Sequence, residues 1–352
     1  MSHEVGVGLV GFGFAGRTFH APVITSVPGL RLLAVVSSRA AEVRANLPDV
    51  AVLQRLDDLL ADDRIALAVV ATPNATHFEL TRRALQAGRH VVVDKPFTVT
   101  TAEALTLTEE ARRRARLLSV FHNRRWDADF LTVQRLLAEA VLGDVVCFES
   151  RYDRFRPEVR DRWRERAEPG SGTWFDLGAH LADQALRLFG PPVALFADLA
   201  RQRSGAQATD YFHVLLRYPG SLRVVLHGSS LAAAGGRQMI VHGTRGTCIT
   251  TGPDPQEEAL KRGERPGGTD WGDDPACARV TMVEHGVAAE RLVEPQRGDY
   301  AEYYRRVRDA LVTGAPNPVP ADEATRVVAI LELAVRSDER REEMAFDDPH
   351  VV

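Results

Sequence analysis

The sequence contains few cysteines and few lysines. Only three of its 352 residues are cysteine, and they are too few and too widely spaced for a disulfide framework or a zinc site, so we expect no metal. This content fits a reducing compartment, and we expect a cytoplasmic protein. Only two of the 44 basic residues are lysine, Lys95 and Lys261. Because lysine can exchange a proton and arginine cannot, Lys95, which follows an apolar run, is a candidate for chemistry.

Long hydrophobic runs and an excess of positive charge are also absent. No apolar run approaches the ~18–20 residues of a membrane span, and the amino-terminal sequence lacks the basic region and apolar core of a signal peptide. The net charge is −4 and the pI is near 6.3. These features argue against a membrane protein and against recruitment of the whole molecule to nucleic acid. The chain length favours two domains over one.

The first third of the sequence alternates apolar runs with amphipathic stretches. The apolar runs predict strands at residues 5–10, 30–37, 50–53, 66–71, 90–93 and 117–121, and helices are predicted at 16–26, 40–46, 56–61, 76–87 and 101–114. Continuous apolar strands that alternate with helices indicate a parallel sheet covered on both faces. We therefore predict a doubly wound α/β domain over residues 1–122.

The turn after the first strand reads G-x-G-x-x-G and contains Gly11, Phe12, Gly13, Phe14 and Gly16. Because it follows a strand and opens a helix, it predicts a dinucleotide-binding site. The first glycine would make the tight turn, the second would let the backbone approach a pyrophosphate, and the third would allow close helix packing. A tight turn without a ligand is the alternative.

The end of the second predicted strand carries Ser37, Ser38 and Arg39 and has no acid. NAD sites place Asp or Glu there to hold the ribose 2′-hydroxyl. Two hydroxyls and a guanidinium instead suit a 2′-phosphate, so we predict NADP(H) rather than NAD(H). The alternative is that Arg39 simply begins a solvated helix.

The loop after the next apolar strand contains Thr72, Pro73, Asn74 and, at the start of a helix, His77. Loops at the carboxyl ends of parallel strands form the ligand crevice in this architecture, so we place these four residues near the cofactor. His77 suits packing or capping better than catalysis.

After residue 122 the pattern changes to closely spaced β-rich runs. Strands are predicted at residues 145–155, 193–202, 210–219, 222–231 and 237–250, and helices at 127–139, 174–189, 300–311 and 321–336. Their close spacing, with Gly, Pro and Asp between them, indicates an antiparallel sheet. Residues 252–277 are polar and rich in Gly and Pro, and we expect a surface excursion there. The second domain is predicted over residues 123–352.

The helix predicted at 174–189 carries a polar stripe of Asp176, His180, Asp183 and Arg187. Taken alone, the stripe favours an exposed face. The Asp176–His180 pair at i, i+4 also suits a catalytic site, since histidine is the commonest general acid or base near neutral pH.

Residues 151–166 combine arginines with aromatic residues and four acids. The acids dilute the positive charge, so we expect these arginines to face cofactor phosphates or a polyhydroxy substrate rather than nucleic acid.

Three features together resemble the Gfo/Idh/MocA family of oxidoreductases. They are the glycine turn, the sequence Asp94-Lys95-Pro96, and the sequence from Asp176 to His180 with Asp183. The finer pattern is similar to the subgroup of NADP-dependent scyllo-inositol dehydrogenases. The resemblance covers nearly the whole chain and implies an N-terminal Rossmann domain and a C-terminal α/β domain with a large, mostly antiparallel open sheet. It implies hydride transfer between a nicotinamide and a secondary alcohol or ketone of a cyclitol or sugar.

The resemblance also implies roles for single residues. Lys95, Asp176 and His180 are expected to be catalytic, and the Lys95–Pro96 peptide is expected to be cis. Asp94 stands where the family more often has Glu, so the contact made by that carboxylate is in question. Further cofactor contacts are expected from Asp94, Lys95, Pro96, Asn123, Arg162 and Trp163, and substrate contacts from Lys95, Asn123, Arg124, Asp127, Tyr152, Asp176 and His180.

The expected partner is a small polyhydroxy substrate, without nucleic acid or membrane, in a homodimer or homotetramer formed through the C-terminal sheet. Two alternatives stay open. One is a reductase of the same fold that acts on a different keto-sugar or on an imine. The other is a regulator that binds NADP without turnover.

Overall fold

The computed structural model describes residues 4–350, which divide into two compact units. Within these residues unit 1 comprises 4–123, 256–271 and 299–325, and unit 2 comprises 124–255, 272–298 and 326–350. The single boundary predicted after residue 122 is therefore incomplete, because two later segments pack with the amino-terminal part of the chain.

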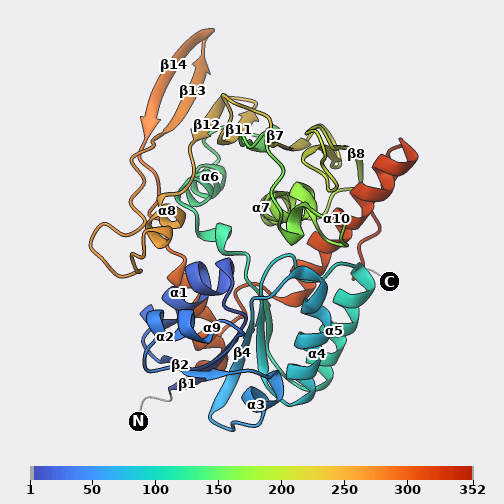
Figure 1. The fold of residues 1–352 in the computed structure, drawn as a ribbon. Coiled ribbons are helices and arrows are strands. Elements are labelled where there is room, and N and C mark those ends of the chain that lie inside the picture. The colour runs from blue at the N-terminus through green and yellow to red at the C-terminus, as the bar shows by residue number, and fades with distance from the viewer. Residues whose placement is uncertain (1–3, 351–352) are drawn as a thin grey trace. The chain divides into compact units, whose positions relative to one another are not determined.

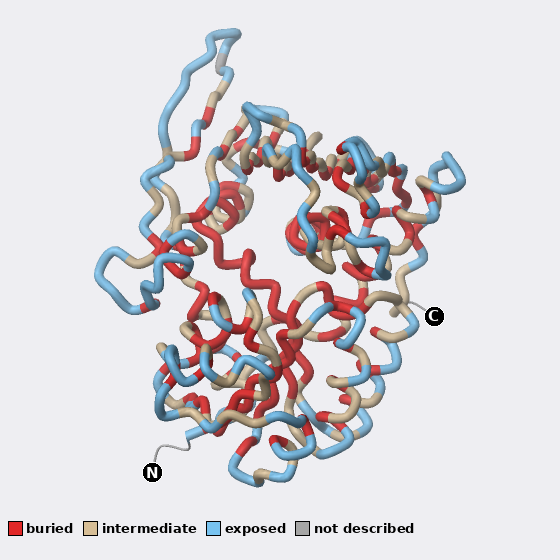
Figure 2. Tube along the Cα trace, in the orientation of Figure 1, coloured by how far each residue is buried: buried red, intermediate tan, exposed pale blue. Residues whose placement is uncertain are grey.

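Unit 1 is built on a parallel sheet (Figure 1). In the described chain its six strands lie in the order β3-β2-β1-β4-β5-β6. They are β1 (Val5–Val10), β2 (Leu30–Val36), β3 (Ala51–Leu53), β4 (Ile65–Val70), β5 (His90–Val93) and β6 (Leu118–Val120). The central strands β1, β4 and β5 are buried along most of their length, as Figure 2 shows, which a parallel sheet covered on both faces requires. The predicted doubly wound sheet is confirmed.

The helices of unit 1 cover both faces of this sheet. They are α1 (Ala21–Ser26), α2 (Ala40–Asn46), α3 (Leu56–Leu60), α4 (His77–Gln86), α5 (Thr101–Arg113), α8 (Pro255–Lys261) and α9 (Ala301–Thr313). Figure 1 shows α4 and α5 on one side and α1 and α9 on the other. Helix α8 falls within the predicted surface excursion, and its Ala259 and Leu260 are buried. That prediction is wrong for this segment, because a short apolar stripe docks it on unit 1.

Unit 2 is built on a larger, mostly antiparallel sheet. Among the described residues its nine strands lie in the order β14-β13-β12-β11-β7-β10-β9-β8-β15, and β7 and β10 pair in parallel. They are β7 (Val145–Tyr152), β8 (Ala194–Ala200), β9 (Tyr211–Arg217), β10 (Arg223–Ser229), β11 (Arg237–Gly243), β12 (Gly246–Thr251), β13 (Ala278–Glu284), β14 (Val287–Val293) and β15 (Met344–Ala345). The hairpin β13–β14 and strand β15 go beyond the sequence predictions.

One face of this second sheet packs against α6 (Ala128–Ala138), α7 (Ala179–Phe189) and most of α10 (Ala321–Arg340), and their apolar side chains form the core of unit 2. Burial alternates along the strands, so that Val224 and Leu226 point into this core while Val225 is partly exposed. No helix within residues 4–350 is long and apolar enough to cross a membrane.

Candidate functional site

The glycine turn joins β1 to a π-helical turn, Gly16–His20, that leads into α1. Gly11 has φ of 99°, and a Cβ there would lie 2.4 Å from the carbonyl oxygen of Ala71. At Gly16 a Cβ would lie 2.2 Å from the carbonyl oxygen of Gly11. At Gly13, by contrast, no described atom lies within 4 Å of that position. The first and third glycines are therefore required by close approach, and the open space at Gly13 fits a pyrophosphate.

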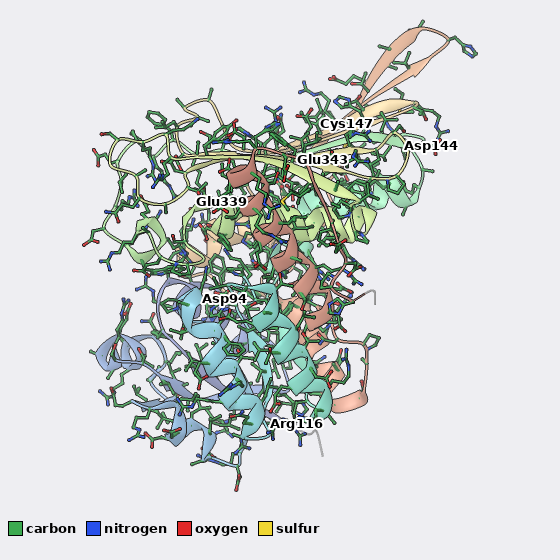
Figure 3. All side chains as sticks on the ribbon, turned by 90° about the vertical axis from the view of Figure 1, so that its right-hand side faces the viewer. Asp94, Arg116, Asp144, Cys147, Glu339 and Glu343 are labelled. Carbon is green, nitrogen blue, oxygen red and sulfur yellow. The ribbon has the colours of Figure 1, made fainter. Side chains whose placement is uncertain are left out.

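The other predicted cofactor residues of unit 1 follow strands at the same edge of the sheet. Residues 37–39 follow β2, residues 72–74 follow β4 and residues 94–96 follow β5. Because these strands are parallel, their carboxyl ends meet at one edge, where such sheets bind ligands. Figure 3 shows Asp94 at this end of unit 1 and Arg116 at the opposite end.

The residues after β2 form a local turn, and the Arg39 guanidinium points to α2. The backbone N–H of Arg39 donates to Ser37 Oγ at 3.0 Å, and the Arg39 guanidinium lies 3.5 Å from Glu42 in α2. Arg17 also pairs with Glu42. The Arg39 side chain is 61% exposed, and a surface ion pair of this kind contributes little, so Arg39 can turn to a phosphate at small cost.

His77 connects two loops of this edge. Its Nδ1 lies 2.9 Å from the carbonyl oxygen of Pro96, and its Nε2 lies 2.9 Å from that of Thr72. Burial lowers the pKa of His77, and the charge of Asp94 opposes this shift. Since both ring nitrogens face backbone carbonyls, the structure gives His77 a packing role in place of the predicted cofactor contact.

Asp94 fixes the backbone of the candidate lysine. Its carboxylate accepts a hydrogen bond from the N–H of Lys95 at 2.8 Å and lies 3.7 Å from His20 Nε2. The Nδ1 of His20 lies 2.7 Å from Tyr304 Oη. Burial raises the pKa of Asp94, but the nearby ring of His20, with smaller contributions from the charges of Lys95 and His77, lowers it to about 2. The Lys95–Pro96 peptide is cis, as predicted.

In unit 2, Asp176 lies within a helix irregularity and His180 lies just after it. Asp176 belongs to a π-helical turn, Trp174–Gly178, and His180 to the first turn of α7. A Cβ at Gly178 would lie 2.1 Å from the ring of Trp174, so glycine lets this buried indole pack against the turn. π-Helical turns recur at functional sites, and this one contains one candidate residue and ends two residues before the other.

The polar stripe of α7 is largely buried. Arg125 donates hydrogen bonds to the carboxylate of Asp183, from Nε at 2.9 Å and from a terminal nitrogen at 2.6 Å. His180 is 6% exposed. Arg187 alone of the stripe is exposed. The prediction that this stripe forms an exposed face is therefore wrong for His180 and Asp183 and holds only for Arg187.

The predicted substrate contacts fall in both units. Asn123 is the last residue of the first segment of unit 1, while Arg124 and Tyr152 of unit 2 contact one another, with Arg124 donating to Tyr152 Oη at 3.2 Å. Asp127 is fully buried, 3.3 Å from Arg124 and paired with Arg237. This burial argues against the substrate contact predicted for Asp127. Across residues 4–350, no group of three or more His, Cys, Asp or Glu could hold a metal ion.

The two residues of the arginine-rich loop predicted to contact the cofactor have partners inside unit 2. Arg162 donates through Nε to Glu165 at 2.8 Å. Trp163 is partly buried, and the guanidinium of Arg164 lies 5.0 Å from the centre of its ring. Arg164 also lies 3.6 Å from Asp176, so this loop reaches a candidate catalytic residue.

Comparisons with known proteins agree over most of the chain. A family model described as the NAD-binding Rossmann fold of an oxidoreductase family matches residues 5–122, and the model of its C-terminal alpha/beta domain matches residues 134–346. YdgJ of Escherichia coli, an uncharacterised oxidoreductase, is 52% identical over 341 residues, which are 97% of this chain and 98% of YdgJ. IolW of Bacillus subtilis, a scyllo-inositol 2-dehydrogenase (NADP(+)), is 38% identical over 337 residues, or 95% and 94% of the two chains. The solved structure of the Yersinia pestis oxidoreductase YPO2259 has a TM-score of 0.94 at 50% identity and covers 99% of this chain and 98% of its own.

Proposed function

Because the chain belongs to the Gfo/Idh/MocA family of oxidoreductases, we propose that it transfers a hydride between NADP(H) and a secondary alcohol or ketone of a cyclitol or sugar. The observation that carries this proposal is the position of Lys95, which lies at the same sheet edge as the glycine turn. The cyclitol or sugar is favoured by the likeness to IolW.

The residues at this edge fit a dinucleotide. In the proposal the open backbone at Gly13 holds the pyrophosphate, and Ser37, Ser38 and Arg39 hold the 2′-phosphate. The absence of an acid from residues 37–39 favours NADP over NAD, since that acid would otherwise bind the ribose hydroxyl.

Bound NADP supplies the chemistry of a hydride acceptor, and the side chains move the proton. His180 accepts the proton of the substrate hydroxyl as a general base. Lys95 stabilises the oxygen as negative charge develops on it and relays the proton, while Asp176 orients the site. Asp94 holds the backbone of Lys95 through the hydrogen bond to its N–H. In the reverse direction the same groups protonate the oxygen of a reduced ketone.

The proposal is tested by a cofactor-reduction assay with the purified full chain. NADP and NAD are each offered with a panel of cyclitols and aldoses, and absorbance at 340 nm is followed. Lys95→Arg keeps the charge but cannot relay a proton, so kcat should fall by roughly 10²–10⁴-fold. Lys261→Arg is the matched control, because it makes the same change at the other lysine, whose ion pairs with Glu257 and Glu258 lie within α8.

Each outcome of this assay bears on one part of the proposal. Near-wild-type turnover by Lys95→Arg would remove the proton relay. Turnover with NAD alone would overturn the assignment of residues 37–39 to NADP. No turnover of any polyol, whether neutral, acidic or phosphorylated, with either cofactor would favour the regulator that binds NADP without catalysis.

We also propose that the second sheet joins copies of the chain into a homodimer or homotetramer. The face of this sheet opposite its helices carries partly exposed apolar side chains, among them Phe196, Leu215, Val225 and Ile240. Burial of such a face against a second copy would remove apolar surface from water. Light scattering on the purified chain measures the mass of the assembly, and a monomer would exclude it.

A further inference from the structure

Unit 2 contains a pocket lined by five arginines, Arg154, Arg156, Arg162, Arg164 and Arg203, which we call the arginine pocket. Two acids, Glu165 and Asp176, also line it, so the lining has a formal excess of three positive charges. The cavity is about 20 Å³, more than the roughly 10–15 Å³ that one water molecule requires. It can therefore admit a small polar group but has no room for a sugar ring.

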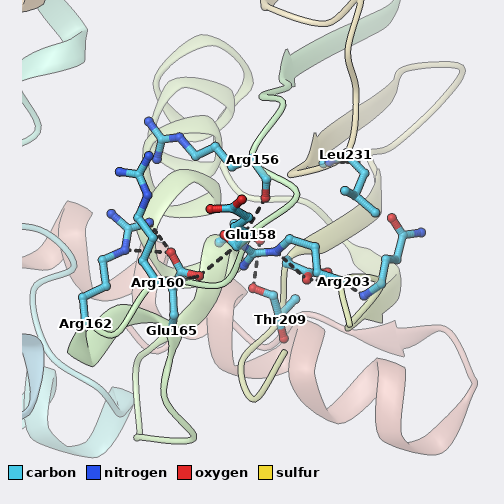
Figure 4. A network of polar contacts seen from close by, with 12 residues as sticks. Arg156, Glu158, Arg160, Arg162, Glu165, Arg203, Thr209 and Leu231 are labelled. Atoms are coloured by element: carbon cyan, nitrogen blue, oxygen red, sulfur yellow. Dashed lines mark hydrogen bonds and ion pairs between the residues drawn. The ribbon is translucent and has the colours of Figure 1, made fainter. Parts of the chain in front are cut away.

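Two of the five arginines build the wall of this pocket. Arg203 pairs with Asp210 at 2.9 Å and with Glu165 at 3.0 Å, and it also donates to the carbonyl oxygens of Arg156 and Glu158 (Figure 4). Arg162 pairs with the other oxygen of Glu165 at 2.6 Å. Their charges are thus balanced inside the protein, and Arg203 ties the loop of residues 156–165 to the segment before β9.

The extended backbone after β7 brings Arg154 and Arg156 to the same side. The N–H of Arg154 donates to the carbonyl oxygen of Ser229 at 2.8 Å, and that of Arg156 to Ser230 at 2.7 Å. Side chains alternate along an extended segment, and Phe155 between them is 57% exposed. The backbone hydrogen bonds to Ser229 and Ser230 therefore place both arginine side chains in the lining of the pocket.

These two guanidinium groups are not held in ion pairs of the kind that Arg203 and Arg162 form, although the charge of Asp176 acts on Arg156. Arg154 stacks on the ring of Tyr152 at 4.6 Å, and neither Arg154 nor Arg156 forms an ion pair with an acid of the described chain. Burial and the charges of the neighbouring arginines lower the pKa of Arg156. The Arg156 guanidinium still keeps its charge at neutral pH, so its repulsion from the neighbouring arginines remains in the folded unit.

We propose that the arginine pocket binds a carboxylate or phosphate group carried by the substrate. This inference rests on the proposed function, because Asp176 belongs both to the pocket and to the proposed catalytic residues. Guanidinium groups bind such anions through paired charge-assisted hydrogen bonds, and the hydroxyl of Ser230 in the lining can add a neutral one. The substrate is thus an acid or phosphate ester of a sugar or cyclitol, and a neutral polyol leaves these charges unmatched.

Binding is measured first, without turnover. D-glucuronate, inorganic phosphate and D-glucose are titrated into the full chain by calorimetry, for wild type, Arg156→Gln and Arg166→Gln. Arg166 lies on the same loop but pairs with Asp161 at the surface, so it is the matched control. The two anions should bind at least about 10-fold more tightly than glucose, and Arg156→Gln should weaken them by about 10–100-fold. Arg156→Lys, which keeps the charge without the fork, should show a smaller loss.

The same variants are then tested for NADPH binding and for turnover of D-glucose, D-glucuronate and glucose 6-phosphate. If Arg156→Gln weakens NADPH and leaves the anions unchanged, the pocket serves the cofactor and the inference is overturned. It is also overturned if neutral substrates alone react and Arg156→Gln does not affect them, although the proposed function would then stand. If no compound reacts while anion binding still depends on Arg156, the pocket is supported and the proposed function fails.

Discussion

Replacing His20 by leucine should destabilise unit 1 through the buried carboxylate of Asp94. The ring of His20 is fully buried, with Nδ1 2.7 Å from Tyr304 Oη and Nε2 3.7 Å from Asp94. A donated hydrogen bond from the tyrosine hydroxyl leaves the proton of His20 on Nε2, where it faces the carboxylate. Leucine fills much of the same volume but cannot offset the burial of this charge.

The magnitude follows from the pKa of Asp94. Its fall from 3.8 to about 2 corresponds to about 2 kcal/mol of folding free energy at neutral pH. Because the pKa of the folded state is the lower one, this contribution is present above pH 3.8 and is lost as the pH falls towards 2. Leaving a buried polar group without its partner costs roughly 1–3 kcal/mol. We expect a loss of about 2 kcal/mol in His20→Leu, or about 4–8 °C in Tm.

Calorimetric unfolding at pH 7 of wild type, His20→Leu, Asp94→Asn and the double variant separates charge from packing. If His20 serves to balance Asp94, the double variant should be more stable than the sum of the single losses predicts, with a coupling of about 1–3 kcal/mol. Additive losses would show that His20 only fills space between Phe121 and Tyr304, and the electrostatic argument would be refuted.

Two further predictions concern the cofactor and the π-helical turn. Arg39→Ala should raise the KM for NADP by about 10–100-fold and leave the KM for NAD unchanged. Arg44→Ala, at an exposed position of α2, should change neither KM. Initial rates with both cofactors check this, and equal rises in the two KM values would contradict it. Gly178→Ala should lower the free energy of unfolding by about 1–3 kcal/mol, because the methyl group would overlap the ring of Trp174. Chemical denaturation measures this loss against Gly268→Ala, where no described atom lies within 4 Å of the new Cβ, and similar losses in both would refute the packing argument.

The fold of unit 1 is predictable because its signals are local. Each buried strand is a continuous apolar run, and the predicted ends lie within one or two residues of those found, as at Val5–Val10 and His90–Val93. Helix α8 is not predictable in this way, because Ala259 and Leu260 become buried only when this segment packs into unit 1. A 3.6-residue period likewise does not reveal the wide turn at Trp174–Gly178.

The candidate site is predictable only where a motif specifies backbone geometry. The roles of Gly11 and Gly16 follow from spacing, and the structure shows the contacts that demand them. The partners of charged residues do not follow from spacing, since Asp183 meets Arg125 across 58 residues and Asp127 meets Arg237 across 110. The position of His20 just after the glycine turn is the one local signal that it belongs to the site. Its partner Tyr304 lies 284 residues away in the sequence, so the contact itself cannot be predicted from spacing.

The non-contiguous make-up of unit 1 has a consequence for protein synthesis. Ser119 of β6 bridges to Pro320 and receives a hydrogen bond from Tyr303 Oη at 2.8 Å, and Phe121 packs against Tyr303 and Tyr304. A ribosome that has finished the last strand of this sheet must add roughly 200 more residues, about 10–40 s of translation, before these side chains emerge. During that interval the end of β6 lacks its final cover, so the amino-terminal third of the chain completes its fold only when synthesis is nearly over.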